Sequence, residues 1–221
     1  MLSYFDAIIF DCDGVIVDSE IIHISIEREL LSEYGLDYSL ETYLSRFMGL
    51  AMPNYYAELE RDYHAKFGKS FPASFEPELT RRAWPRIEAD LKAIPGLEDL
   101  VSSLTQPVAV ASSSPIDRLT RKLEITGLSH LFKPHIYSAQ HVENGKPAPD
   151  LFLFAAKQLK ASPLRCVVIE DSENGVRAGR AAGMSVIGFT GGQHADPGLA
   201  DRLKTAGAHH IASGHAELFS R

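Results

Sequence analysis

An apolar segment that ends in two carboxylates constrains the fold of this chain more than any other feature. Residues 7–10 read Ala-Ile-Ile-Phe and run directly into Asp11, Cys12, Asp13 and Gly14. Side chains alternate along a strand, so Asp11 and Asp13 should leave it on the same side. Two like charges at this spacing repel each other unless a cation or a proton lies between them. We therefore predict a buried strand that ends in an active site; the alternative is an ordinary turn, which Asp and Gly favour.

The overall composition narrows the class of protein. The chain has 221 residues, of which 45% are hydrophobic and 23% charged, and its formal net charge is −7. This acidic balance argues against nucleic acid or an anionic membrane as the main partner. No apolar run approaches the length of a membrane span, and the first residues do not resemble a signal peptide. We expect a cytoplasmic protein, with a monomer as the default state.

The C-terminal half alternates short apolar segments with helical stretches. Such alternation predicts an α/β fold, a doubly wound parallel sheet of the Rossmann-like type with helices on both faces. Further strands are expected at 107–111, 135–138, 165–169, 185–189 and 208–211, and helices near 115–126, 149–160 and 172–183.

The segment that follows the first strand has a different pattern. Between residues 18 and 93 only helical periodicity is found, as in 22–34, where large apolar residues recur every four positions. An insertion of this length is not a simple crossover between strands. We therefore expect two domains, an α/β core formed by 1–17 and 94–221 and a helical cap formed by 18–93. The cap would lie above the carboxyl ends of the strands, where α/β sheets bind ligands.

Three more groups of polar residues lie close to predicted strand or helix ends. Ser112 and Ser113 follow one strand, Glu170 and Asp171 follow another, and Lys146 precedes a helix that begins with proline. Each group has an ordinary explanation as a turn, a helix cap or a solvated side chain. Because the carboxyl ends of parallel strands share one edge of the sheet, together the groups predict a single site.

In these motifs the chain resembles the haloacid dehalogenase superfamily. The resemblance is to the branch in which a small helical cap is inserted between the first and second of four sequence motifs. That branch contains phosphoglycolate-type phosphatases, other sugar-phosphate phosphatases and β-phosphoglucomutase. The resemblance runs from Ala7 to about Ile211. The four motifs are FDCDGVIVDSE (10–20), VASSS (110–114), GKPAPD (145–150) and VIEDSENGVRAGRAAGM (168–184).

The resemblance implies a role for each acidic residue of the motifs. Asp11 is placed as the nucleophile that attacks phosphorus and forms an aspartyl-phosphate. Asp13 is placed as the general acid for the leaving oxygen and later as the base for the attacking water. Mg²⁺ prefers hard oxygen ligands, and it would be held by Asp11, Glu170 and Asp171 together with the backbone carbonyl of Asp13.

Three further positions complete the implied site. Ser112 is matched to the phosphate-binding hydroxyl, and Ser113 would add its backbone N–H. Lys146 is matched to the cation that neutralises the nucleophile and the transferring oxygens. The resemblance thus implies a Mg²⁺-dependent phosphatase that hydrolyses a small phosphate monoester, such as a sugar phosphate.

A phosphosugar mutase of the β-phosphoglucomutase type is the alternative. His23 matches a histidine on the first cap helix of the mutases and is a candidate substrate-binding residue. However, Met48 and Met52 stand where the mutase motif has a lysine and an arginine that hold a second phosphate. Each lost charge-assisted contact is worth about 1.5–3 kcal/mol, so we favour a phosphatase.

Other functions fit the sequence less well. Asp13 and the acid pair at 170–171 argue against a true dehalogenase. A phosphoacceptor signalling receiver has its acid pair at the first strand and its acceptor later, which is the reverse of the order here. Four arginines of the predicted cap either recognise an anionic group or form a solvated surface, and we favour the surface: Arg46, Arg81, Arg82 and Arg86.

Overall fold

The computed structural model describes residues 2–48, 50 and 52–219, and the chain in it divides into two units. One unit consists of Met1–Glu20 and Leu91–Arg221 and contains the β-sheet; we call it the sheet unit. The other, Ile21–Asp90, is called the helical unit. Each is described by itself below.

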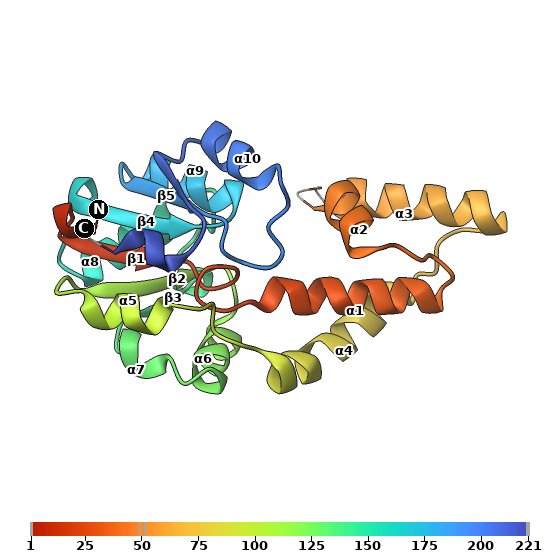
Figure 1. Ribbon diagram of the computed structural model, residues 1–221, viewed down its shortest axis with the longest axis horizontal. Coiled ribbons are helices and arrows are strands. Elements are labelled where there is room, and N and C mark those ends of the chain that lie inside the picture. The colour runs from red at the N-terminus through yellow and green to blue at the C-terminus, as the bar shows by residue number, and fades with distance from the viewer. Residues whose placement is uncertain (1, 49, 51, 220–221) are drawn as a thin grey trace. The chain divides into compact units, whose positions relative to one another are not determined.

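The sheet unit is built on six parallel strands in the order β3-β2-β1-β4-β5-β6. This is the doubly wound 3-2-1-4-5-6 order, in which ligands bind outside the carboxyl ends of the strands. The predicted α/β class is therefore confirmed. The strands are β1 (Ala7–Phe10), β2 (Val108–Ser112), β3 (Ile136–Ser138), β4 (Cys166–Glu170), β5 (Ser185–Phe189) and β6 (His210–Ala212). Strands β1 to β5 are labelled in Figure 1.

The central strand β1 is buried on both faces. Ile9 lies in register with Ala109 of β2 on one side and Val168 of β4 on the other. All four residues of β1 are fully buried, which explains why its sequence is continuously apolar rather than alternating. Burial of each large side chain contributes about 1.5–3 kcal/mol, so this strand anchors the residues that follow it.

Helices cover the two faces of the sheet. Ile9 contributes to a core with α8, α9 and α10, whereas the next residue, Phe10, packs edge-on against Phe132 of α7 on the opposite face. The α-helices of the sheet unit are α5 (Leu97–Ser103), α6 (Ile116–Ile125), α7 (Ser129–Phe132), α8 (Asp150–Gln158), α9 (Glu173–Ala181) and α10 (Leu199–Ala206). Its short 3-10 helices are η1 (Leu2–Tyr4), η2 (Ala139–His141), η3 (Pro163–Arg165) and η4 (His215–Leu218).

The helical unit contains most of α1 and three further helices. Its core is rich in aromatic side chains, among them Tyr43, Phe47, Tyr55 and Phe75. Ser39 caps the second helix by accepting a hydrogen bond from the backbone N–H of Thr42 at 3.0 Å. The helices are α1 (Ser19–Glu33), which begins in the sheet unit, α2 (Leu40–Phe47), α3 (Met52–Phe67) and α4 (Phe75–Asp90).

The two chain segments that lead into and out of the helical insertion are hydrogen-bonded to each other within the sheet unit. Val17 and Ala93 form an antiparallel bridge. On either side of it the backbone N–H of Asp18 donates to Lys92 O at 3.0 Å, and the N–H of Ile94 donates to Ile16 O at 2.9 Å. The insertion therefore starts and ends at adjacent points of a two-stranded ribbon.

Within the described part of the chain, no helix has both the length and the hydropathy needed to cross a membrane.

Candidate active site

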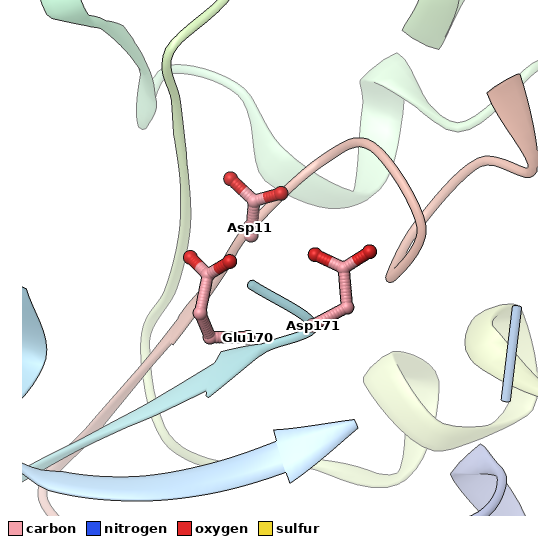
Figure 2. Close-up of side chains that lie close together, drawn as sticks. All are labelled: Asp11, Glu170 and Asp171. Carbon is pink, nitrogen blue, oxygen red and sulfur yellow. The ribbon is translucent and has the colours of Figure 1, made fainter. Parts of the chain in front are cut away.

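Three buried carboxylates meet where β1 and β4 end. Asp11 directly follows β1, Glu170 is the last residue of β4, and Asp171 comes next. Each offers an oxygen within 4.8 Å of the others, and Figure 2 shows the three side chains directed to the same region. The exposed fractions of these residues are 7, 1 and 8%. The parallel order of the sheet thus brings residues 160 positions apart to one edge.

Lys146 supplies a buried positive charge to this cluster. Its Nζ lies 2.5 Å from Asp11 Oδ1 and 2.7 Å from Glu170 Oε2, and its side chain is 5% exposed. Burial by itself would lower the pKa of this lysine, but the charges of Asp11 and Glu170 outweigh that effect and raise it. Lys146 is therefore charged at neutral pH.

The start of α9 fixes the position of Glu170. Ser172 caps this helix by accepting from the backbone N–H of Gly175 at 3.1 Å, and its own hydroxyl donates to Glu170 Oε1 at 2.7 Å. A Cβ at position 175 would lie 1.9 Å from Glu170 Cδ, so only glycine leaves room for this carboxylate. Helix and strand therefore hold Glu170 between Ser172 and Lys146.

The cluster carries more negative charge than Lys146 can neutralise. Burial, followed by repulsion from Glu170, raises the pKa values of both Asp11 and Asp171 well above the usual carboxyl range. When all three are ionised, the carboxylates exceed the charge of the one ammonium group by two negative charges. Buried oxygen ligands with this excess suit a hard divalent cation, so Asp11, Glu170 and Asp171 fit a Mg²⁺ site.

Asp13, the second carboxylate of the first motif, faces a separate set of partners. Its Oδ2 accepts from Ser114 Oγ at 2.9 Å, and its Oδ1 is bound by the Ser19 hydroxyl and by Nζ of Lys122. Lys122 lies on α6 and is 5% exposed. This lysine lies outside the four sequence motifs, although its spacing of three residues from Leu119 places it on the buried face of the helix.

These partners keep Asp13 ionised. Burial alone would raise its pKa, but the charge of Lys122 and hydrogen bonds from Lys122, Ser19 and Ser114 outweigh burial and lower the pKa below the ordinary carboxyl value. Asp11 and Asp13 thus have pKa values displaced in opposite directions. Paired carboxylates separated in this way are a recurring arrangement in enzymes that divide acid–base and nucleophilic roles between two acids.

The two serines predicted to bind phosphate differ in their surroundings. Ser112 ends β2, is 1% exposed, and accepts from the backbone N–H of Ser114 at 3.0 Å. That bond leaves the Ser112 hydroxyl proton for another acceptor. Ser113 is exposed to solvent immediately after the strand. Both lie at the edge of the sheet where the strands end and where Asp11 follows β1.

A histidine that sequence analysis did not consider lies against the acidic cluster. His194, in the loop after β5, is 4% exposed, and its Nε2 is 3.1 Å from Asp171 Oδ2. Burial lowers the pKa of His194, so the ring is neutral at neutral pH. Gly14 has a φ of +75° and lies against both side chains. A Cβ at this position would lie 1.8 Å from Asp171 Oδ2 and 2.7 Å from the imidazole, so only glycine leaves room for them. The glycine pair at 191–192, after a strand of the same sheet, is the sequence signal that could have identified this loop.

The predicted residues of the cap lie in the helical unit. His23 is partly buried on α1, Met48 follows the last residue of α2, and Met52 is the first residue of α3. Residues 49 and 51 of the motif that distinguishes phosphatase from mutase lie outside the described residues. The four arginines form ion pairs with carboxylates of the same unit: Arg46 with Glu58 and Asp62, Arg81 with Glu78, Arg82 with Glu33 and Glu78, and Arg86 with Glu29 and Asp90.

Comparison with known protein families identifies the family of this chain. The model of the haloacid dehalogenase-like hydrolases matches residues 8–189. The chain belongs to this family. The family model spans the sheet unit from β1 to β5 and the whole helical unit, so both parts of the fold are included in the assignment.

Two curated relatives that match most of this chain are phosphatases. The chain is 27% identical to the 6-phosphogluconate phosphatase of Escherichia coli (strain K12) over 92% of this chain and 91% of the relative. It is 31% identical to a fructose-1-phosphate phosphatase of the same organism over 85% of this chain and 97% of the relative.

Solved structures of haloacid dehalogenase-like proteins share the fold. A conserved protein of unknown function from Agrobacterium tumefaciens has a TM-score of 0.87 and 42% identity, with 97% of this chain and 96% of that chain covered. A hydrolase from Deinococcus radiodurans R1, solved with bound phosphate and sodium, has a TM-score of 0.83 and 37% identity, with coverage of 97 and 93%. A putative β-phosphoglucomutase from Thermotoga maritima has a TM-score of 0.72 and 25% identity, with coverage of 96 and 97%.

These findings confirm the family, the fold class and the enzyme class expected from the sequence. The chain is a haloacid dehalogenase-like phosphatase, a phosphoric monoester hydrolase.

Proposed function

We propose that this haloacid dehalogenase-like phosphatase hydrolyses a small sugar phosphate or sugar-acid phosphate in two steps, through an aspartyl-phosphate on Asp11 with Mg²⁺ as cofactor. The observation that carries the proposal is the meeting of Asp11, Lys146, Glu170 and Asp171 at one edge of the sheet. It combines a nucleophilic carboxylate, a fixed ammonium group and spare carboxylate ligands for a cation, which phosphoryl transfer requires.

The first half-reaction moves the phosphoryl group from substrate to enzyme. A carboxylate oxygen of Asp11 attacks phosphorus, and the bond from phosphorus to the ester oxygen breaks. Asp13, protonated by the water of the preceding turnover, gives its proton to that leaving oxygen, so the alcohol departs neutral and Asp13 returns to the ionised form that its lowered pKa favours. Lys146, 2.5 Å from Asp11, offsets the negative charge on the nucleophile and on the transferring oxygens.

The second half-reaction restores the enzyme. Water attacks phosphorus of the aspartyl-phosphate, the bond from phosphorus to Asp11 breaks, and inorganic phosphate is released. Asp13 takes the proton from the attacking water, for which it must be ionised, the form that its lowered pKa favours. That proton is then available for the leaving oxygen of the next substrate. Ser112 donates its hydroxyl to a phosphoryl oxygen, and Ser113 adds its backbone N–H.

The cation would be held by Asp11, Glu170 and Asp171, with the backbone carbonyl of Asp13 as a further ligand. When bound, Mg²⁺ supplies positive charge that allows an anionic nucleophile to approach an anionic ester.

The substrate class rests on the relatives. Two phosphatases that match most of this chain act on 6-phosphogluconate and fructose 1-phosphate, which are a phosphorylated sugar acid and a phosphorylated sugar. The helical unit, with His23 on α1, is proposed to select among such compounds. We also keep a cytoplasmic location and a monomeric state as predictions.

A direct test measures phosphate release from a panel of sugar phosphates and sugar-acid phosphates with and without Mg²⁺. We expect Mg²⁺-dependent hydrolysis of at least one compound and of a generic aryl phosphate. Asp11→Asn removes the nucleophile and should abolish both activities. Unchanged hydrolysis by this variant would refute the assignment of Asp11.

The likeness to a putative β-phosphoglucomutase makes a mutase the second candidate. It is tested with β-glucose 1-phosphate and its bisphosphate activator. Isomerisation without release of phosphate would favour a mutase, whereas release of phosphate would favour the proposed phosphatase.

A further inference from the structure

We propose that His194 is a positioning residue that holds one oxygen of Asp171, so that Asp171 offers a single oxygen to the cation. The inference rests on the proposed function, because it concerns the same cation site. Its subject is a residue in the loop after β5, which lies outside the four sequence motifs.

The contact itself is short and buried. His194 Nε2 lies 3.1 Å from Asp171 Oδ2, and the two side chains are 5 and 9% exposed. A carboxylate only accepts, so an attractive contact requires the ring proton on Nε2. The other ring nitrogen, Nδ1, has no hydrogen-bond partner among the described residues. A buried polar atom without a partner costs about 1–3 kcal/mol. Asp171 is therefore the hydrogen-bond partner that offsets the burial of this ring among the described residues.

The surrounding backbone makes room for the imidazole. A Cβ at Gly14 or at Gly192 would come within 2.7 Å of the His194 ring. The loop is also tied down, because the backbone N–H of Gln193 donates to Asp18 Oδ1 at 3.2 Å. Two glycines and one anchored loop thus fix the ring against Asp171.

The contact distinguishes the two oxygens of Asp171. Oδ2 faces His194 and Gly14, which leaves Oδ1 for the cation. In Figure 2 one oxygen of Asp171 is directed toward Asp11 and Glu170, and the other points away from them. Mg²⁺ requires near-octahedral geometry, whereas Ca²⁺ accepts carboxylates that bind through both oxygens. Holding Oδ2 should therefore favour Mg²⁺ over Ca²⁺.

The experiment measures binding of Mg²⁺ and of Ca²⁺ to the metal-free full-length protein by isothermal titration calorimetry. His194→Leu removes the donor, and we expect Mg²⁺ affinity to fall about 10–100-fold, as is typical when a partner of a metal ligand is lost. Ca²⁺ affinity should fall less, so the preference for Mg²⁺ narrows. His194→Gln should retain most of the preference, because the amide nitrogen of Gln can occupy the place of Nε2.

A second buried histidine provides the matched control. His215 is 1% exposed, stacks on Phe189 and has its Nδ1 3.1 Å from Pro95 O. Its Nε2 lacks a partner among the described residues, as does Nδ1 of His194. His215→Leu should therefore change stability without changing the ratio of Mg²⁺ to Ca²⁺ affinity.

Three results with the leucine variants would overturn the inference. They are unchanged Mg²⁺ binding by His194→Leu, an equal loss of both cations, and the same change in the His215 control. If His194→Leu does not fold, Gln is compared with Asn, whose shorter side chain should not reach Asp171; equal preference in these two variants overturns the inference. A wild-type protein that does not bind Mg²⁺, or Asp171→Asn that binds it normally, refutes the proposed cation site as well.

Discussion

Each carboxylate of the Asp-x-Asp motif has its own buried lysine. Lys146 contacts Asp11, and Lys122 contacts Asp13. The first lysine faces Glu170 as well, so its charge is shared, whereas Asp13 receives Lys122 together with two hydroxyl groups. At Asp11, burial and repulsion from Glu170 raise the pKa beyond what Lys146 offsets, whereas at Asp13 the charge of Lys122 and the hydrogen bonds outweigh burial and lower it.

Replacement of Lys122 by Met should destabilise the protein by leaving Asp13 unpaired. Loss of one partner of a buried ion pair lowers the free energy of unfolding by about 3–5 kcal/mol. Because the Asp13 side chain is 20% exposed, we expect a loss near the lower end of this range. A carboxylate whose pKa is lowered by folding stabilises the native state above its ordinary pKa near 4. The loss should thus be complete at neutral pH and shrink as the pH falls below 4.

Urea denaturation at several pH values measures this effect. Arg121→Met is the control, because Arg121 precedes Lys122 on α6 and its side chain is 51% exposed. An equal loss in both variants would show that the helix, and not the ion pair, accounts for the change.

Asp171 should destabilise the metal-free protein at neutral pH, whereas ionised Asp13 paired with Lys122 stabilises it. Burial, then repulsion from Glu170 and Glu20, raises its pKa on folding. Such a group stabilises the native state below its unfolded pKa, and this contribution is lost as the pH rises through the folded pKa. We therefore expect metal-free Asp171→Asn to melt at a higher temperature than wild type at pH 7, with the difference vanishing near pH 4.

Each kcal/mol gained by this variant corresponds to about 2–4 °C in Tm for a chain of this size. Added Mg²⁺ should raise the Tm of the wild type and have little effect on Asp171→Asn. A variant less stable than wild type at pH 7 in the absence of metal would contradict the argument.

At the scale of elements, strands were easier to predict than the contacts that complete the site. β5 spans the predicted 185–189, and β1, β2 and β4 lie within one residue of their predicted bounds, because central strands are buried on both faces and therefore read as apolar runs. From the sequence alone, the carboxyl ends of these strands place Asp11, Ser112, Glu170 and Asp171 at one edge of the sheet.

The sequence does not predict Lys122 or His194 as site residues, for different reasons. A lysine on an amphipathic helix is usually solvated, and only its three-residue spacing from Leu119 marks it as buried. The loop of His194 has no helical or strand periodicity, so its approach to Asp171 depends on tertiary packing around Gly14. Local patterns do not encode such long-range contacts.

Gly175 shows how one helix position supports the site. Alanine there would normally favour a helix by about 0.5–1 kcal/mol. Its Cβ would lie 1.9 Å from Glu170, so we expect Gly175→Ala to cost about 1–3 kcal/mol of stability and to lower kcat by displacing Glu170 from Lys146.

Thermal denaturation and steady-state kinetics check this result. Gly214→Ala is the matched control, because nothing lies within 4 Å of the added Cβ and its φ of 176° suits any residue. A Gly175 variant with normal kcat would show that the position of Glu170 is not critical.

At the scale of the whole molecule, the proposed function assigns chemistry and substrate choice to different units. The sheet unit contains every acidic and basic residue of the proposed mechanism. In the helical unit, the guanidinium group of Arg82 is bound to Glu33 through both Nη atoms, at 2.6 and 2.8 Å, and to Glu78 through Nε at 2.7 Å. Because its donors face carboxylates, this arginine is poorly suited to bind an anionic substrate.

Arg82→Gln should therefore leave KM unchanged for both a sugar phosphate and an aryl phosphate. Steady-state kinetics with the two substrates provides the test. An increase in KM for the sugar phosphate alone would mean that Arg82 takes part in substrate recognition.

The ribbon at Val17 and Ala93 has a consequence for how such enzymes diversify. Since the chain leaves and re-enters the sheet unit at neighbouring positions, the intervening seventy or so residues impose no strain on strand pairing. A lineage could exchange that entire segment for one of another length, acquiring new specificity while inheriting an intact catalytic centre.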